Sequence, residues 1–125
     1  MKRPRPPLYK IGEEMKAWSA ALQDEVASWP GVTIRPMFGL FGVYRGGNIF
    51  AVLPRTRTMN LPNSIGFRLP EGSARLRSRA RRDPKVHLAQ GDNPKWLVFE
   101  ITRDDDLRGA IEWRARSFEA ARYAR

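Results

Sequence analysis

The segment from Thr33 to Leu69 constrains the fold more than any other stretch, because it concentrates β-branched and aromatic residues between glycines and prolines. Runs of this kind are typical of short strands. The pattern predicts strands over residues 33–38, 40–45, 48–53 and 64–69. Gly46-Gly47 predicts a two-residue hairpin turn between the second and third strands, because such turns need positive φ. Pro36 restricts the first strand to a sheet edge or a bulge.

Helices are predicted on both sides of this segment, over residues 13–29 and 105–123, because apolar residues recur there at helical spacing. The two apolar stripes consist of Met15, Trp18, Leu22, Val26 and Trp29, and of Leu107, Ile111, Ala115 and Phe118. A further strand is predicted over residues 95–102. Residues 55–63, polar and bounded by Pro54 and Pro62, are expected to form a loop.

The arginine-rich stretch after Pro70 is compatible with two structures. Pro70 and Ser73 suit the start of a short helix that runs to about Arg81. Arginines at positions 75, 77, 79 and 81 also alternate with smaller or apolar residues, which is the periodicity of a strand. Helix-forming residues dominate the stretch, so the helix is favoured.

These elements predict an α+β protein with a small antiparallel β-sheet, an N-terminal helix, a short middle helix and a C-terminal helix. We expect a basic, proline-rich arm over residues 1–12 and a single domain over residues 13–125. A chain of 125 residues can bury one ordinary core. It contains no cysteine, which excludes disulfides and thiolate chemistry.

The formal net charge of +10 is large for this length and is concentrated on the arm and on residues 31–90. Such a charge attracts polyanions without defining a specific site. No apolar run is long enough for a membrane span, and no apolar segment follows the basic N-terminus as in a secretory signal. We therefore expect a cytoplasmic protein that does not enter membranes.

The ordered blocks of this chain resemble the N-terminal domain of TfoX and the related small YjbR-type proteins. The resemblance rests on Arg35-Pro36-Met37-Phe38-Gly39, the Gly46-Gly47 hairpin, Ile49-Phe50-Ala51, Phe67-Arg68-Leu69-Pro70 and Lys95-Trp96-Leu97-Val98. It covers about residues 18–123 and implies an α+β domain that acts as a regulatory module rather than as an enzyme. The loop at 55–63 and the arginine cluster at 75–82 have no counterpart in that pattern. The chain also leaves no room for the second domain of full TfoX proteins.

Two basic groups are candidate binding sites. The first is the densest basic run, which could contact the phosphates of a nucleic acid or another polyanion, or could be a solvated face paired with Glu71 and Asp83. It comprises Arg75, Arg77, Arg79, Arg81, Arg82 and Lys85. The second group is Arg55, Arg57 and Arg68, which could hold a phosphate or carboxylate of a ligand or partner, the alternative being a plain connecting loop.

Other candidates have simpler structural explanations. Phe38, Phe41, Tyr44 and Phe50 could form a base-stacking sheet platform, but at strand spacing they are expected to be core. His87 has no partners at metal-site or triad spacing, and Asp104, Asp105 and Asp106 fit the start of a helix better than a metal site.

With no catalytic constellation, cofactor motif or metal motif, we expect a non-enzymatic binding or regulatory module. Its partner would be another protein or a polyanion, and homodimerisation is plausible. Two alternatives remain: a nucleic-acid-binding protein that uses its arginine-rich segment, and a protein or enzyme that binds a small anionic ligand.

Overall fold

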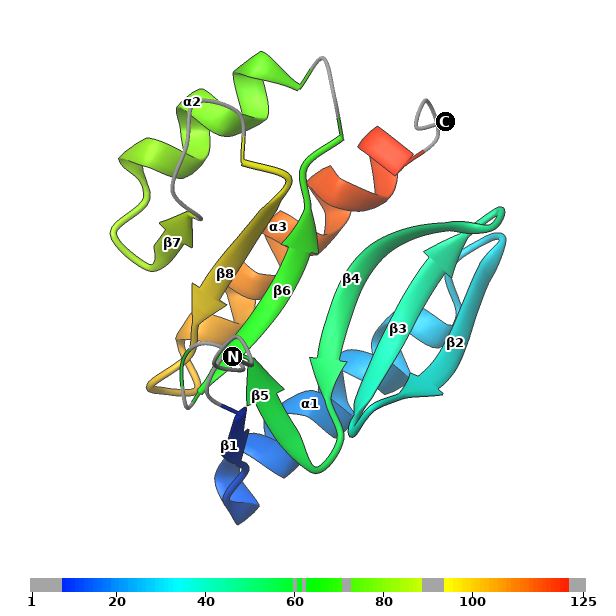
Figure 1. The fold of residues 1–125 in the computed structure, drawn as a ribbon, viewed down its shortest axis with the longest axis vertical. Coiled ribbons are helices and arrows are strands. Elements are labelled where there is room, and N and C mark those ends of the chain that lie inside the picture. The colour runs from blue at the N-terminus through cyan, green and yellow to red at the C-terminus, as the bar shows by residue number, and fades with distance from the viewer. Residues whose placement is uncertain (1–7, 60, 62, 71–72, 89–93, 122–125) are drawn as a thin grey trace, which may run out of the picture.

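The computed structural model describes residues 8–59, 61, 63–70, 73–88 and 94–121 (Figure 1). It has the predicted α+β architecture, with three helices and a six-stranded antiparallel sheet. The elements are β1 (Leu8–Lys10), α1 (Glu13–Ala27), β2 (Val32–Met37), β3 (Leu40–Arg45), β4 (Asn48–Pro54), β5 (Arg57–Met59), β6 (Ser64–Arg68), α2 (Ala74–Arg82), β7 (Val86–Leu88), β8 (Trp96–Glu100) and α3 (Asp106–Ala121). None of the helices formed by these described residues is long and apolar enough to cross a bilayer.

The main sheet has the strand order β2-β3-β4-β6-β8-β7, and β1 pairs with β5 in a second, two-stranded sheet. β2 lies at the edge, which is where a strand can accommodate Pro36. Gly46 and Gly47 have φ of 55° and 89° and close the β3–β4 hairpin. The glycine turn predicted from the sequence is confirmed, and of the two positions allowed for Pro36, a sheet edge or a bulge, the structure shows the edge.

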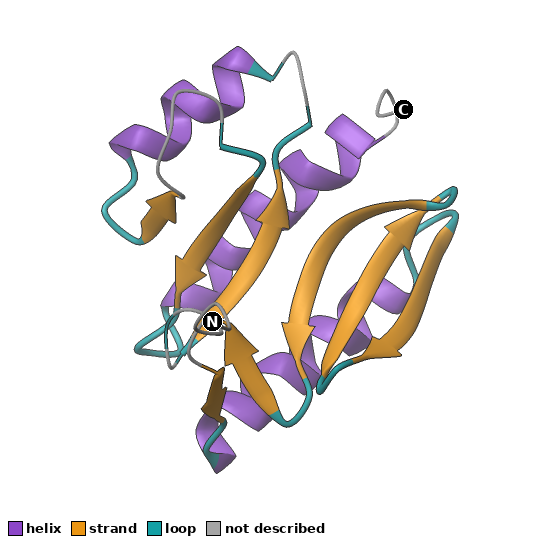
Figure 2. Cartoon of the chain, viewed as in Figure 1, coloured by secondary structure: helices purple, strands orange, loops and turns teal. Residues whose placement is uncertain are grey.

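The core lies between one face of the sheet and the helices α1 and α3, which Figure 2 shows behind the strands. The predicted stripe of α1 is confirmed for Met15, Trp18, Leu22 and Val26, which are buried, whereas Trp29 lies beyond the end of the helix and is only partly buried. The predicted stripe of α3 was partly wrong, because Ala115 is exposed and the buried residues include Ala110, Trp113, Arg114 and Phe118. α3 packs against both the sheet and α1, so its buried sector is wider than one stripe.

Three short strands were not predicted. β5 lies in the segment that was expected to be a loop, and β7 pairs with β8 at the second edge of the sheet. β1 and the buried Ile11 lie in the predicted arm, so the arm from residue 8 onward is built into the fold, while residues 1–7 lie outside the described residues. Strands of three residues are too short to show a periodicity. The arginine-rich stretch forms the helix α2, so the prediction of a helix rather than a strand is confirmed.

A buried arginine fastens α3 to α1. The Arg114 guanidinium donates to the carbonyl of Leu22, pairs with the carboxylate of Glu25 and lies 4.9 Å above the Trp29 ring centroid. Burial lowers the pKa of Arg114 to about 10, because a low-dielectric environment disfavours the charged form. Arg114 therefore serves the fold rather than a surface site.

Candidate functional site

Among the residues that the structure describes, no helix covers one face of the main sheet. Gly42, Val52, Gly66 and Val98 are successive cross-strand partners and therefore point to the same side. Their sequence neighbours Val43, Ala51, Phe67 and Leu97 belong to the helix-covered core. We call the side that carries the first set the helix-free face; in Figure 1 it is turned toward the viewer, in front of α1 and α3.

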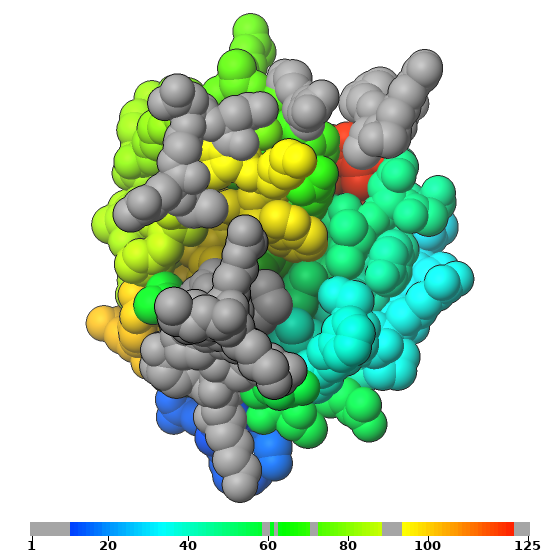
Figure 3. Space-filling view, in the orientation of Figure 1, coloured from blue at the N-terminus to red at the C-terminus, as the bar shows by residue number. Residues whose placement is uncertain are grey.

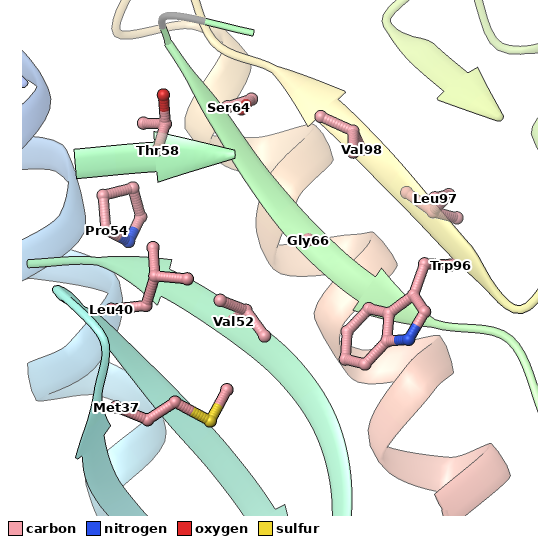
Figure 4. Close-up of a pocket in the computed structure, with 10 residues that line it drawn as sticks. All are labelled: Met37, Leu40, Val52, Pro54, Thr58, Ser64, Gly66, Trp96, Leu97 and Val98. Carbon is pink, nitrogen blue, oxygen red and sulfur yellow. The ribbon is translucent and has the colours of Figure 1, made fainter. Parts of the chain in front are cut away.

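An apolar pocket of about 200 Å³ opens on the helix-free face (Figure 4). Trp96 stands at one end of it, Met37 and Leu40 line the β2–β3 side, and Thr58 lies toward the other end. The lining residues are Met37, Leu40, Val52, Pro54, Thr58, Ser64, Gly66, Trp96, Leu97 and Val98. The Thr58 and Ser64 hydroxyls both donate to the carbonyl of Leu61, at 2.6 and 2.8 Å. The pocket therefore offers a largely apolar surface to a ligand.

Two aromatic rings lie against glycines on this face. A Cβ at Gly66 would stand 3.7 Å from Cε3 of Trp96, and a Cβ at Gly42 would stand 3.0 Å from Cε1 of Tyr44. Each ring thus packs over the glycine backbone, in the space next to where a side chain would project. Trp96 and Tyr44 are both only partly buried.

An arginine lies over each of these rings. The Arg68 guanidinium carbon is 5.8 Å from the Trp96 ring centroid, and that of Arg35 is 5.6 Å from the Tyr44 centroid. Such cation–π contacts contribute about 0.5–1 kcal/mol at exposed sites and favour a position of the guanidinium group over the ring. Arg68 pairs across the sheet with Trp96, and Arg35 pairs with Gly42 beside Val52, so both cations flank the pocket.

The space-filling view shows the surface on both sides of the pocket (Figure 3). The yellow surface around the start of β8 and the blue-green surface of β3 and β4 are both visible on this side of the molecule. The pocket walls therefore come from segments far apart in the sequence.

The predicted site at Arg55, Arg57 and Arg68 is not one cluster. Arg57 Nε donates to the carbonyl of Phe38 at 2.9 Å, and Arg55 lies 5.8 Å over the ring of Phe41. Arg68 stands instead beside Trp96. Arg55 and Arg57 thus support the β2–β3 turn, while Arg68 lies over Trp96, which lines the pocket.

The turn that they support, Phe38-Gly39, is strained and exposed. Phe38 has a φ of 50° and is 86% exposed, and Gly39 has a φ of 82°. The carbonyl of Gly39 accepts the backbone N–H groups of Arg55, Thr56 and Arg57, at 3.1, 2.9 and 3.4 Å. The β4–β5 connection therefore holds the turn in place.

The six residues of the predicted basic run divide into two kinds. Arg77 is buried and Lys85 pairs with Asp106 at 3.2 Å, so both are structural. The others, Arg75, Arg79, Arg81 and Arg82, are exposed on α2. Helical spacing places Arg77 on the opposite side of α2 from Arg75, Arg79 and Arg82, whereas the exposed Arg81 lies on nearly the same side as Arg77.

The acidic cluster and the histidine have structural partners. Asp104 accepts the Trp18 indole N–H at 2.7 Å, Asp105 pairs with Arg103 at 2.6 Å, and His87 lies 3.3 Å from Glu100. Burial acts to raise the pKa of Asp106, but hydrogen bonds from Thr102, Lys85 and Arg103 outweigh it and lower that pKa. In the part of the chain that the structure describes, no group of three His, Asp or Glu side chains is placed to hold a metal ion.

The expectation that four aromatic residues are core was wrong for two of them: Phe38 is 86% exposed in the β2–β3 turn, and Tyr44 lies partly buried beside Gly42 on the helix-free face. Phe50 is fully buried and Phe41 packs against the core, as expected for strand residues. Trp96 was not considered. Its alternation with Val98 and Glu100, opposite the core residues Leu97 and Phe99, was the signal that could have placed it on the second face of the sheet.

No protein-family model, curated protein or solved structure matches this chain.

Proposed function

We propose that the protein is a non-enzymatic binding module whose ligand enters the pocket on the helix-free face. One observation carries this proposal: an apolar pocket flanked by two arginines, each of which lies over an aromatic ring. Binding pockets typically combine an apolar lining with a few placed polar groups that orient the ligand. Here Arg35 and Arg68 are those groups.

The chemistry of the lining suggests the ligand class. The indole of Trp96 and the bare backbone of Gly66 offer flat surfaces to a planar apolar group, and the flexible Met37 can adapt to its outline. Guanidinium groups favour carboxylate, phosphate or sulfonate partners. We therefore propose a ligand with a flat ring and an anionic group.

Binding is favoured over catalysis because the hydroxyls that line the pocket are donors to a backbone carbonyl. A nucleophile would instead be held by a general base. The lone histidine, His87, lies beside Glu100 rather than among the lining residues. The proposal keeps the regulatory role that the TfoX resemblance implies.

Titration with 1-anilinonaphthalene-8-sulfonate tests the proposal, because this probe combines a flat ring with an anion. We expect saturable fluorescence enhancement at one site. Gly66→Leu should abolish it by filling the pocket, while the matched control Ala17→Leu, exposed on α1, should bind as the wild type does. Thermal melts of each variant exclude binding to unfolded chain.

A second pair of variants tests whether Arg68 binds the anionic group of the ligand. Arg68→Gln should weaken the probe about fivefold to tenfold, whereas Arg108→Gln, an exposed change on α3, should not. Equal binding by the wild type and Gly66→Leu would overturn the assignment of the pocket. Equal binding by the wild type and Arg68→Gln would overturn the role of the arginine.

A further inference from the structure

α2 presents an unusual concentration of positive charge that the pocket does not use. Five of its nine residues are arginine and none is acidic. Arg75, Arg79 and Arg82 recur at spacings of four and three, so they form one row along the exposed side of the helix. We call these three residues the α2 ridge.

The side of α2 opposite the ridge is anchored to the rest of the fold by Arg77. Arg77, on the opposite side of α2, is only 5% exposed; it donates from Nε to the carbonyl of Pro94 at 3.0 Å and from Nη2 to that of Leu69 at 3.1 Å. These bonds tie α2 to the end of β6 and to the residue that leads into β8. Ala80 adds a buried apolar contact. The direction in which the ridge faces is therefore fixed by the fold.

Asp83, the acidic residue next to the ridge, forms hydrogen bonds with residues outside the ridge. Asp83 accepts the Trp113 indole N–H at 2.8 Å and the backbone N–H of Lys85 at 2.9 Å. Within the described ranges of the chain, no ion pair involves Arg75, Arg79 or Arg82. Glu71, considered from the sequence as a partner, lies outside the described residues.

A further cation on α3 adjoins the ridge. The pKa of Arg116 is lowered, first by burial and then by the nearby positive charge of Arg79, with Glu112 and Asp83 only partly offsetting both. Arg116 itself lies 4.9 Å over the Trp113 ring, on the side of α3 that faces α2. Like charges gathered in this way are stabilised by an anion that binds them together.

We propose that the α2 ridge binds the phosphate backbone of a nucleic-acid duplex without reading its sequence. Arg75 and Arg82 are about 10 Å apart along the helix axis, a length over which one DNA strand carries about three phosphates. Guanidinium groups bind phosphate through paired N–H groups. The net charge of +10 favours the same partner. This surface is separate from the proposed pocket and does not depend on it.

Fluorescence anisotropy with a labelled mixed-sequence DNA duplex tests the proposal between 50 and 200 mM NaCl. Three phosphate contacts give a slope of log affinity against log salt of about −2.7 from the ridge alone. The variant Arg75→Gln/Arg79→Gln/Arg82→Gln should lose that part of the slope and at least about tenfold in affinity at 50 mM. Glutamine preserves helix propensity, and circular dichroism checks the fold.

The matched control is Arg55→Gln/Lys95→Gln/Arg108→Gln, which removes the same charge from exposed positions outside α2. This control should keep a steeper slope of log affinity against log salt than the ridge variant, and it should bind the DNA duplex more tightly. Equal losses in the two triple variants would overturn the proposal in favour of net charge. Absence of wild-type binding at 50 mM, or binding of polyglutamate in preference to DNA, would also overturn it.

Discussion

Trp96 lays its indole ring against the backbone of Gly66 on the neighbouring strand, where a Cβ would stand 3.7 Å from ring atom Cε3. The same Cβ would be 3.6 Å from Cβ of Val52. Both distances are ordinary van der Waals contacts, so position 66 tolerates a small side chain. The strand conformation of Gly66 does not itself require glycine. The absence of a side chain at this position therefore matters for the shape of the pocket rather than for the backbone.

Gly66→Ala is expected to stabilise the protein by about 0.5–1 kcal/mol, because alanine reduces the entropy of the unfolded chain and fits the native strand. Urea unfolding measures the change. The same variant should bind the naphthalene sulfonate probe more weakly than the wild type, since its methyl group enters the pocket. A loss of stability instead of a gain would show that the strand at position 66 is more crowded than described.

Gly39→Ala is expected to destabilise the protein by at least about 2 kcal/mol, through left-handed backbone strain and a collision. Its Cβ would lie 2.5 Å from Arg57 Nε and 2.8 Å from Thr56 Oγ1. Gly47→Ala is the matched control, with a φ of 89° but nothing within 4 Å of its Cβ, and should cost only about 1 kcal/mol. Equal costs in chemical denaturation would remove the packing part of this explanation.

Phe38→Asn is expected to raise the free energy of unfolding by about 1 kcal/mol. Phe38 has a φ of 50° and is 86% exposed, and asparagine adopts left-handed conformations more readily. The change also creates Asn-Gly, the pair favoured in two-residue hairpin turns. A destabilised variant, measured by urea unfolding, would mean that the phenyl ring makes contacts that offset its backbone strain.

The ion pair between the buried Arg114 and the exposed Glu25 should respond unequally to removal of its two members. Glu25→Gln leaves a buried cation without its anion and should cost about 2 kcal/mol, less than for a fully buried pair because Glu25 is 42% exposed. Arg114→Met leaves Glu25 free to hydrate and should change stability by less than about 1 kcal/mol. Adding Glu25→Gln to Arg114→Met should then have little effect. Equal costs for the two single variants would contradict this account of the pair.

Asp106 should make stability sensitive to acid. Because hydrogen bonds hold its pKa below the usual 3.8, its contribution is present above that value and is lost as the pH falls through the lower native pKa. Asp106→Asn should cost about 1 kcal/mol at pH 7, the usual size of a helix-start contact. The difference from the wild type should shrink toward zero at low pH. A difference that does not vary with pH would exclude the charged contacts to Thr102, Lys85 and Arg103.

The sequence predicted the elements that carry strong local signals. The Gly46-Gly47 turn and the stripe from Met15 to Val26 follow from backbone conformation and periodicity, and both are confirmed. Pro36 limited its strand to an edge or a bulge, and the structure shows the edge. β5 and β7 are three residues long and exist because neighbouring strands supply their hydrogen bonds, which no local pattern records. The burial of Arg114 was not predicted for a related reason, since its partners Leu22 and Glu25 lie on α1, which is far from α3 in the sequence.

The pocket was beyond sequence analysis because it depends on strand order. Met37 and Trp96 line one pocket only because β4 and β6 bring the β2–β3 hairpin and β8 into one sheet. Arg68 was selected from the sequence, but with loop arginines that the structure places at a different turn. In the arginine-rich stretch, helical spacing places Arg77 opposite Arg75 and Arg79 but on the same side as the exposed Arg81. The burial of Arg77 therefore could not be read from the spacing, because its two carbonyl partners are supplied by the tertiary structure.

The four tryptophans provide the most direct test of the proposed pocket. Their indole N–H signals can be followed by NMR during titration with 1-anilinonaphthalene-8-sulfonate; those of Trp18 and Trp113 are hydrogen bonded to Asp104 and Asp83, outside the pocket. We predict that the Trp96 indole and the Gly66 amide shift together and saturate together, while the Trp18 and Trp113 indoles stay in place. Saturable shifts at Trp18 or Trp113 with Trp96 unmoved would contradict the account.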